Sequence, residues 1–286
     1  MVKIIDTFSQ IEPLFDNGTF NIEKWESYIN SIYDNSANVF KDDLRECLDS
    51  GNYVYEKDIL PILNAVCDNP HLQTLYSSFC KITDGLNKTI YDRFGCELNI
   101  DIVLYMGLCN AAGWITTING RDVVLLGIEK ILELNWCDVS SMYGLIYHEL
   151  GHVYHKQYGI FHQHSDNRNL NFVWQLFTEG IAMHFEQVLI NNFNYYHQDK
   201  NGWLEWCDNH FKQILEDFYN DLPTMTKSNQ KYFGDWVSYH GKSDVGYYLG
   251  TKFVQQLCDK YDLVQLINLT IDDVYQEFSF FAESKL

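Results

Sequence analysis

The chain has 286 residues, of which 46% are hydrophobic and 21% are charged, a composition typical of a globular protein with a sizeable core. Its 20 Lys and Arg residues stand against 39 Asp and Glu residues, which gives a formal net charge of −19. A chain this acidic repels the phosphate backbone of nucleic acids and anionic membrane surfaces, so neither is expected as a partner.

The first part of the chain, residues 1–98, is expected to be a helical lobe. From Ile22 to about Gly95, apolar residues recur mostly at helical spacing, and turn signals such as Asn69-Pro70 separate the helices. This lobe carries no chemical motif.

A small β-sheet is expected to open the second part, residues 99–286. The run from Ile100 to Met106 alternates as a strand does, and two β-prone runs, 114–118 and 123–126, flank Asn119-Gly120. A type I′ hairpin turn needs positive φ at both central positions, which Asn-Gly favours. The sequence therefore predicts a hairpin ahead of the later helices.

Helices are expected after the hairpin. Asp138 is a candidate N-cap of a helix that runs to about Tyr158. Beyond a polar loop, helices are expected over 171–190, 203–219, 245–258 and 271–282. The predicted fold class is mainly α (α+β), with a helical lobe, a small sheet or hairpin, and then a second helical domain.

The segment His148-Glu149-Leu150-Gly151-His152 carries the chemistry. Residues four apart share one face of a helix, so His148 and His152 can present two imidazole nitrogens to one tetrahedral zinc ion, one per chain. Glu149 lies about 100° round the helix from His148 and can reach a metal-bound water. An open coordination position beside a general base predicts a zinc hydrolase.

The third zinc ligand is predicted to be Glu179, in Thr178-Glu179-Gly180-Ile181-Ala182. It heads an apolar helix that can lie against the first one, and a carboxylate completes a His₂Glu set. Glu186, two turns further on, is the rival, or a group that orients a ligand histidine. His155 lies seven residues beyond His148, too far along the helix to share the metal, and is expected to pack or to support a ligand.

The metzincin pattern does not apply, because His155 and Tyr158 stand where that pattern has Gly and the final His. Together with Thr-Glu-Gly-Ile-Ala, the motif resembles the gluzincin metallopeptidases. The stretch around Glu179 is similar to the aminopeptidase N type, and His148 to His155 looks more like the thimet oligopeptidase type. The best likeness is to small predicted bacterial zinc proteases, over roughly residues 100 to 260.

The resemblance implies a peptide or protein substrate and a donor to the oxyanion. The region from Tyr239 to Gly250 resembles its counterpart in thimet-type peptidases, which implies Tyr247 first, then His240, then Tyr248 and Tyr239. By analogy, residues 113–118 are expected either to pair with substrate as an edge strand or only to cover the core as part of the hairpin.

The chain also departs from these families. Twenty-six residues separate His152 from Glu179, more than in the aminopeptidase N type, and the Gly-Ala-Met-Glu-Asn exopeptidase signature is absent. Met183 stands where thermolysin-like enzymes have Asp. Endo- and exopeptidase activity therefore stay open.

Two alternatives remain from the sequence. A peptide deformylase or related amidase would use an upstream Cys ligand, for which Cys109 is the candidate, although its sequence context differs. A non-catalytic, metal-stabilised interaction domain would hold a closed metal site or none. Scattered cysteines, no apolar run of membrane-spanning length and no signal-peptide core in the first residues lead us to expect a cytoplasmic protein.

Overall fold

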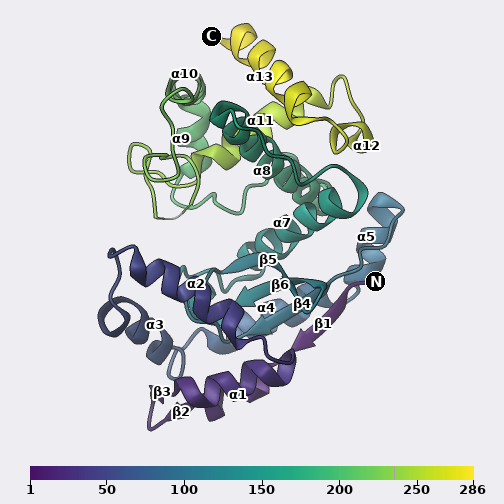
Figure 1. The fold of residues 1–286 in the computed structure, drawn as a ribbon. Helices are drawn as coiled ribbons and strands as arrows, with labels where there is room; N and C mark the ends of the chain where they lie inside the picture. The colour runs from purple at the N-terminus through teal and green to yellow at the C-terminus, as the bar shows by residue number, and fades with distance from the viewer. Residues whose placement is uncertain (235) are drawn as a thin grey trace. The chain divides into compact units, whose positions relative to one another are not determined.

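The computed structural model describes residues 1–234 and 236–286, which divide into two compact units, residues 1–149 and 150–286 (Figure 1). The first unit contains strands β1 (Lys3–Asp6), β2 (Phe15–Asp16), β3 (Thr19–Phe20), β4 (Asp101–Tyr105), β5 (Gly113–Ile118) and β6 (Arg121–Gly127), and helices α1 (Ile22–Ile32), α2 (Ala37–Asp49), α3 (Leu60–Ala65), α4 (Leu72–Thr83), α5 (Leu86–Phe94) and α6 (Ile128–Glu133). Helix α7 (Val139–Tyr158) begins in the first unit and ends in the second. The second unit continues with α8 (Arg168–Ile190), α9 (Trp203–Asn209), α10 (Phe211–Asp221), α11 (Val245–Leu257), α12 (Leu263–Leu266) and α13 (Ile271–Lys285). The fold is mainly helical with a small mixed sheet, which confirms the predicted class.

The first unit is organised around a four-stranded sheet in the order β1-β4-β6-β5. Strands β1 and β6 both pair with β4 in parallel, and β5 pairs antiparallel with β6. Every residue of β4 is buried, as expected for a strand covered on both faces. Strand β1 was not expected, since a helical lobe was predicted over residues 1–98, and the boundary predicted at 98/99 falls inside this first unit.

The β5–β6 hairpin forms where the sequence predicted it. Asn119 and Gly120 have φ values of 52° and 76°, the positive values that a type I′ turn requires. Ile118 pairs with Arg121 directly across the turn. The hairpin leaves β5 as an edge strand in the described residues, because β6 is its one neighbour in the sheet.

The second unit is built around α8, whose side chains are mostly buried, with α11 and α13 packed along it (Figure 1). The helices predicted over 171–190, 245–258 and 271–282 are present. The single helix predicted over 203–219 is wrong, because the structure breaks it at His210 into α9 and α10. The apolar spacing continues across the break, so periodicity alone did not reveal it.

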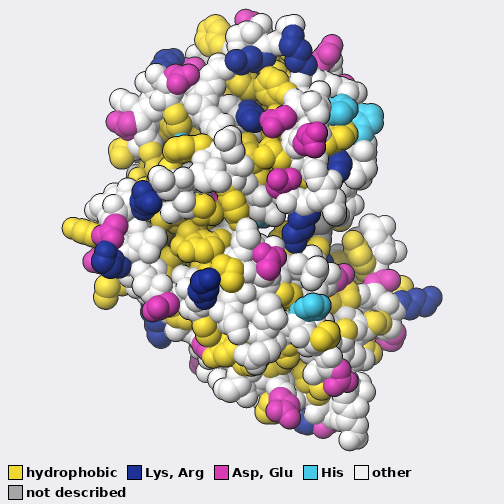
Figure 2. Space-filling view, turned by 180° about the vertical axis from the view of Figure 1, so that it is seen from behind, with side chains coloured by type: hydrophobic (Ala, Val, Ile, Leu, Met, Phe, Trp, Pro, Cys, Tyr) yellow, Lys and Arg dark blue, Asp and Glu magenta, His cyan; other side chains and the backbone are white. Residues whose placement is uncertain are grey.

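Two further features concern membranes and the distribution of charge. None of the helices in the described part of the chain is long and apolar enough to cross a membrane. The face shown in Figure 2 carries acidic and basic side chains interspersed among hydrophobic ones, so the acidic excess does not gather there in one block.

Candidate metal centre

Helix α7 positions the His-Glu-Leu-Gly-His motif. Asp138 caps its N-terminus: the Oδ1 atom of Asp138 accepts hydrogen bonds from the backbone N–H groups of Ser140 at 2.9 Å and Ser141 at 3.0 Å. These contacts satisfy two of the N–H groups that a helix leaves open at its start. The helix runs unbroken to Tyr158, so His148 and His152 lie one turn apart on the same face.

Small residues bring the neighbouring helices of the second unit together. A β-carbon added to Gly151 of α7 would lie 2.6 Å from the Cα of Ala182 in α8. One added to Gly180 of α8 would lie 2.3 Å from the carbonyl oxygen of Gly250 in α11. Real β-carbons essentially never come closer than 3.0 Å, so these glycines are required by close helix contacts. The small residues of the Glu-Gly-Ile-Ala sequence therefore set how closely α8 approaches α7 and α11.

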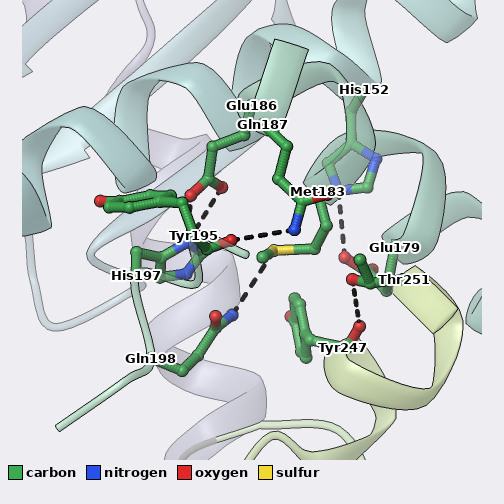
Figure 3. Close-up of polar contacts among 10 residues, drawn as sticks. All are labelled: His152, Glu179, Met183, Glu186, Gln187, Tyr195, His197, Gln198, Tyr247 and Thr251. Carbon is green, nitrogen blue, oxygen red and sulfur yellow. Dashed lines mark hydrogen bonds and ion pairs between the residues drawn. The ribbon is translucent and has the colours of Figure 1, made fainter. Parts of the chain in front are cut away.

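His148, His152 and Glu179 form a group that can hold a metal ion. One potential ligand atom from each residue lies within 4.8 Å of the others. The Nε2 atom of His152 and the Oε2 atom of Glu179 are 3.2 Å apart, with 13% and 15% of their side chains exposed (Figure 3). Two ligands at zinc-bonding distance in tetrahedral geometry are separated by about 3.3 Å, so this pair already has the spacing that zinc requires. The two imidazoles and one carboxylate also match the donor set of catalytic zinc sites.

Glu149 lies beside the start of the edge strand. Its side chain is buried, with the residue 8% exposed. A β-carbon added to Gly113, the first residue of β5, would lie 3.2 Å from Glu149 Oε1 and 2.7 Å from a methyl group of Leu145. Glycine at position 113 therefore leaves room for the Glu149 carboxylate next to β5.

A second group of potential metal ligands contains His148, Glu186 and His197. Glu186 is fully buried, and the Nδ1 atom of His197 lies 3.2 Å and 3.0 Å from its two carboxylate oxygens (Figure 3). Glu186 was a candidate from the sequence, whereas His197 was not. His197 belongs to no recognisable motif and reaches α8 only because the chain turns back after that helix, so no spacing signal could have revealed it.

The residues predicted to stabilise the oxyanion differ in their surroundings. Tyr247 is half-buried in the first turn of α11, one turn before Gly250, where that helix crosses α8 beside Glu179. His240 is exposed, with φ of 51° and its ring edge-on to Tyr239 at 4.6 Å. These roles stay predictions.

The two lower-ranked tyrosines have structural hydrogen bonds. The hydroxyl of Tyr239 donates to Asp217 at 2.6 Å, and that of Tyr248 donates to Asp208 at 2.7 Å. Burial, followed by the neighbouring carboxylate, raises the pKa of both tyrosines. Both hydroxyls are therefore committed to carboxylates of their own unit.

His155 packs inside the second unit. Its ring is fully buried among Phe161, Trp174 and Phe177, with ring centroids 5.4 to 5.9 Å away. Burial lowers its pKa to about 3, so the ring is neutral at physiological pH. The packing role expected for His155 agrees with these contacts, and neither group of potential metal ligands in the described residues includes it.

Cys109 also lies outside both groups of potential ligands found in the described part of the chain. It sits in the loop after β4, which Glu129 holds in place. The Glu129 carboxylate accepts hydrogen bonds from the backbone N–H groups of Gly107 at 2.8 Å and Cys109 at 3.0 Å. Complete burial raises the pKa of Glu129 to about 7, although these backbone hydrogen bonds oppose the shift. In the described residues, Cys109 is therefore part of a loop anchored by Glu129 and not of either group of potential metal ligands.

Comparisons of the chain with models of protein families, with curated proteins and with solved structures gave no match. The function is therefore inferred from the geometry of the site.

Proposed function

We propose that this protein is a zinc-dependent metallopeptidase of the gluzincin kind. One observation carries the proposal: two imidazoles one turn apart on α7 meet the Glu179 carboxylate of α8 in a single ligand group. The 3.2 Å separation of His152 and Glu179 agrees with shared zinc ligation. Glu149, which follows His148 directly in the chain, supplies the acid–base group that hydrolysis needs.

The ligands would be His148, His152 and Glu179, and zinc bound there would lower the pKa of a water and polarise a substrate carbonyl. The Glu149 carboxylate takes a proton from the attacking water and delivers it to the leaving amine. An extended peptide pairs with the open edge of β5 through backbone hydrogen bonds, which brings its chain past Gly113 and Glu149. The Tyr247 hydroxyl, with His240 as the second candidate, donates to the carbonyl oxygen as it gains negative charge.

The substitution Glu149→Gln tests this proposal. It keeps the size of the side chain and removes its basicity, so zinc binding should persist while peptide hydrolysis falls by about 10²-fold or more. Glu133→Gln is the matched control, since Glu133 forms an ion pair with Lys130 at 2.6 Å on α6 and has no part in the proposed site. Hydrolysis is measured on a library of fluorogenic peptides, and zinc is measured by metal analysis of the purified protein.

Two results would contradict the proposal. Undiminished cleavage by the Glu149→Gln variant would remove Glu149 from the mechanism. A wild-type protein that holds zinc but cleaves no peptide and binds no hydroxamate would instead be a metal-stabilised interaction domain. A separate variant, Cys109→Ala, should keep its zinc, and loss of the metal would favour the deformylase-like alternative.

A further inference from the structure

The segment of residues 195–198, which we call the strap, lies back along α8 after that helix has ended (Figure 3). The side-chain amide of Gln187 donates to the carbonyl oxygen of Tyr195 at 2.9 Å. One residue before the end of the strap, His197 meets Glu186, and the amide of Gln198 contacts the sulfur of Met183 at 3.8 Å. The contacts step along α8 from position 187 to 183, in the direction of Glu179.

The central contact of the strap joins two buried ionisable groups. The side chains of Glu186 and His197 are 0% and 7% exposed, and His197 Nδ1 lies near 3 Å from both carboxylate oxygens. A buried carboxylate is strongly destabilising unless a partner offsets the loss of hydration. A contact to both oxygens also restricts rotation of the carboxylate group. His197 therefore helps to hold the Glu186 carboxylate in place.

Potential ligand atoms of Glu186, His197 and His148 all lie within 4.8 Å of one another. The same holds for His148, His152 and Glu179. His148 thus belongs to both groups. A histidine that binds a metal through one ring nitrogen commonly uses the other to contact a carboxylate, which fixes the orientation of the ring. A carboxylate oxygen of the buried Glu186 lies within 4.8 Å of a ring nitrogen of His148, which is near enough for this carboxylate to serve that purpose.

We propose that His197 is a positioning residue for the metal centre: through Glu186 it holds the ring of His148 in the orientation that binds zinc. The inference rests on the metal site of the proposed function and does not depend on peptide hydrolysis. In this role His197 acts through Glu186 and not as a metal ligand. Its effect passes through one carboxylate to one ligand.

The test measures zinc affinity, by competition with a chelator, in the purified full-length protein. His197→Ala should weaken zinc binding by about 10- to 100-fold, the usual effect of removing a group that supports a metal ligand. His197→Asn should restore most of the affinity, because the amide nitrogen of Asn falls near the place of Nδ1. Gln198→Ala is the matched control: it removes another contact of the strap with α8 and should leave the affinity unchanged. The absorption spectrum of bound Co²⁺ should change in His197→Ala and not in the control.

Two outcomes would overturn the inference. Wild-type zinc affinity in His197→Ala, with only thermal stability lowered, would make the strap purely structural. Two zinc ions per wild-type chain, one of them lost in His197→Ala, would make the second group a metal site in its own right. If His197→Ala does not fold, the isosteric Glu186→Gln variant should show the same loss of affinity, and normal affinity there would equally refute the inference.

Failure of the proposed function gives a different pattern. A protein that binds zinc, responds to His197→Ala as expected and cleaves no peptide would contradict only the peptidase proposal. A wild-type chain that binds no zinc would contradict both.

Discussion

Replacement of Gly180 by alanine tests the close crossing of α8 and α11 beside Glu179. The new β-carbon would lie 2.3 Å from the Gly250 carbonyl oxygen, where ordinary contact begins at 3.4 Å. The overlap is therefore about 1 Å against rigid backbone, and overpacking of this kind costs about 3 kcal/mol. The higher helix propensity of alanine offsets about 1 kcal/mol of this cost, so the free energy of unfolding should fall by about 2 kcal/mol.

Urea denaturation of the metal-free protein measures this loss, and a double-mutant cycle tests its cause. A β-carbon on Gly250 would lie 2.2 Å from the Leu176 carbonyl oxygen, at the same crossing. Once one methyl group has separated the helices, the second enters space already opened, so the double variant should lose less than the sum of the single losses. Gly159→Ala is the control, because its β-carbon would instead meet the Ile267 carbonyl oxygen at 2.2 Å and its loss should add to that of Gly180→Ala. A Gly180→Ala protein as stable as wild type, or an additive cycle at the crossing, would refute the reasoning.

The other predictions concern charge, capping and catalysis. The pKa of Glu129 rises from 4.5 unfolded to about 7 folded, so its stabilisation is present below pH 4.5 and lost as the pH rises through 7. Unfolding experiments should show Glu129→Gln gaining about 3 kcal/mol relative to wild type between pH 4 and pH 8, and a flat difference would contradict this shift. Asp138→Ala should lower the free energy of unfolding by about 1 kcal/mol through loss of the α7 cap, whereas unchanged stability in urea would mean the cap contributes nothing. Tyr247→Phe should lower kcat by about 10²-fold without loss of zinc. Tyr248→Phe should retain the wild-type kcat, because the Tyr248 hydroxyl donates its hydrogen bond to Asp208. Equal values of kcat in the two variants would show that Tyr247 does not stabilise the oxyanion.

Features governed by short-range chemistry were predictable from the sequence. Asn119-Gly120 favours positive φ at two successive residues, and the hairpin turn follows from that preference. Asp138 precedes a long apolar stripe and caps the helix as expected. The spacing of His148 and His152 fixes their shared face of α7. Each of these depends on at most a few neighbouring residues.

Features governed by distant contacts were not predictable. Strand β1 is four residues long, and its pairing partner β4 lies almost a hundred residues away, so no local pattern separates it from a loop. The break at His210 interrupts a continuous apolar period. His197 approaches Glu186 only through the return of the chain along α8. Long-range pairing, a helix break within a regular period and a loop contact all lack a signal in residue spacing.

A zinc titration of the wild-type protein beside its Glu179→Ala variant tests the central claim most directly. If His148, His152 and Glu179 hold the metal, the wild type binds one zinc ion per chain and Glu179→Ala weakens that binding by more than about 100-fold, since loss of a direct ligand should exceed the loss of a supporting group. Unchanged zinc affinity in Glu179→Ala, or a wild-type chain that binds no zinc, would contradict it.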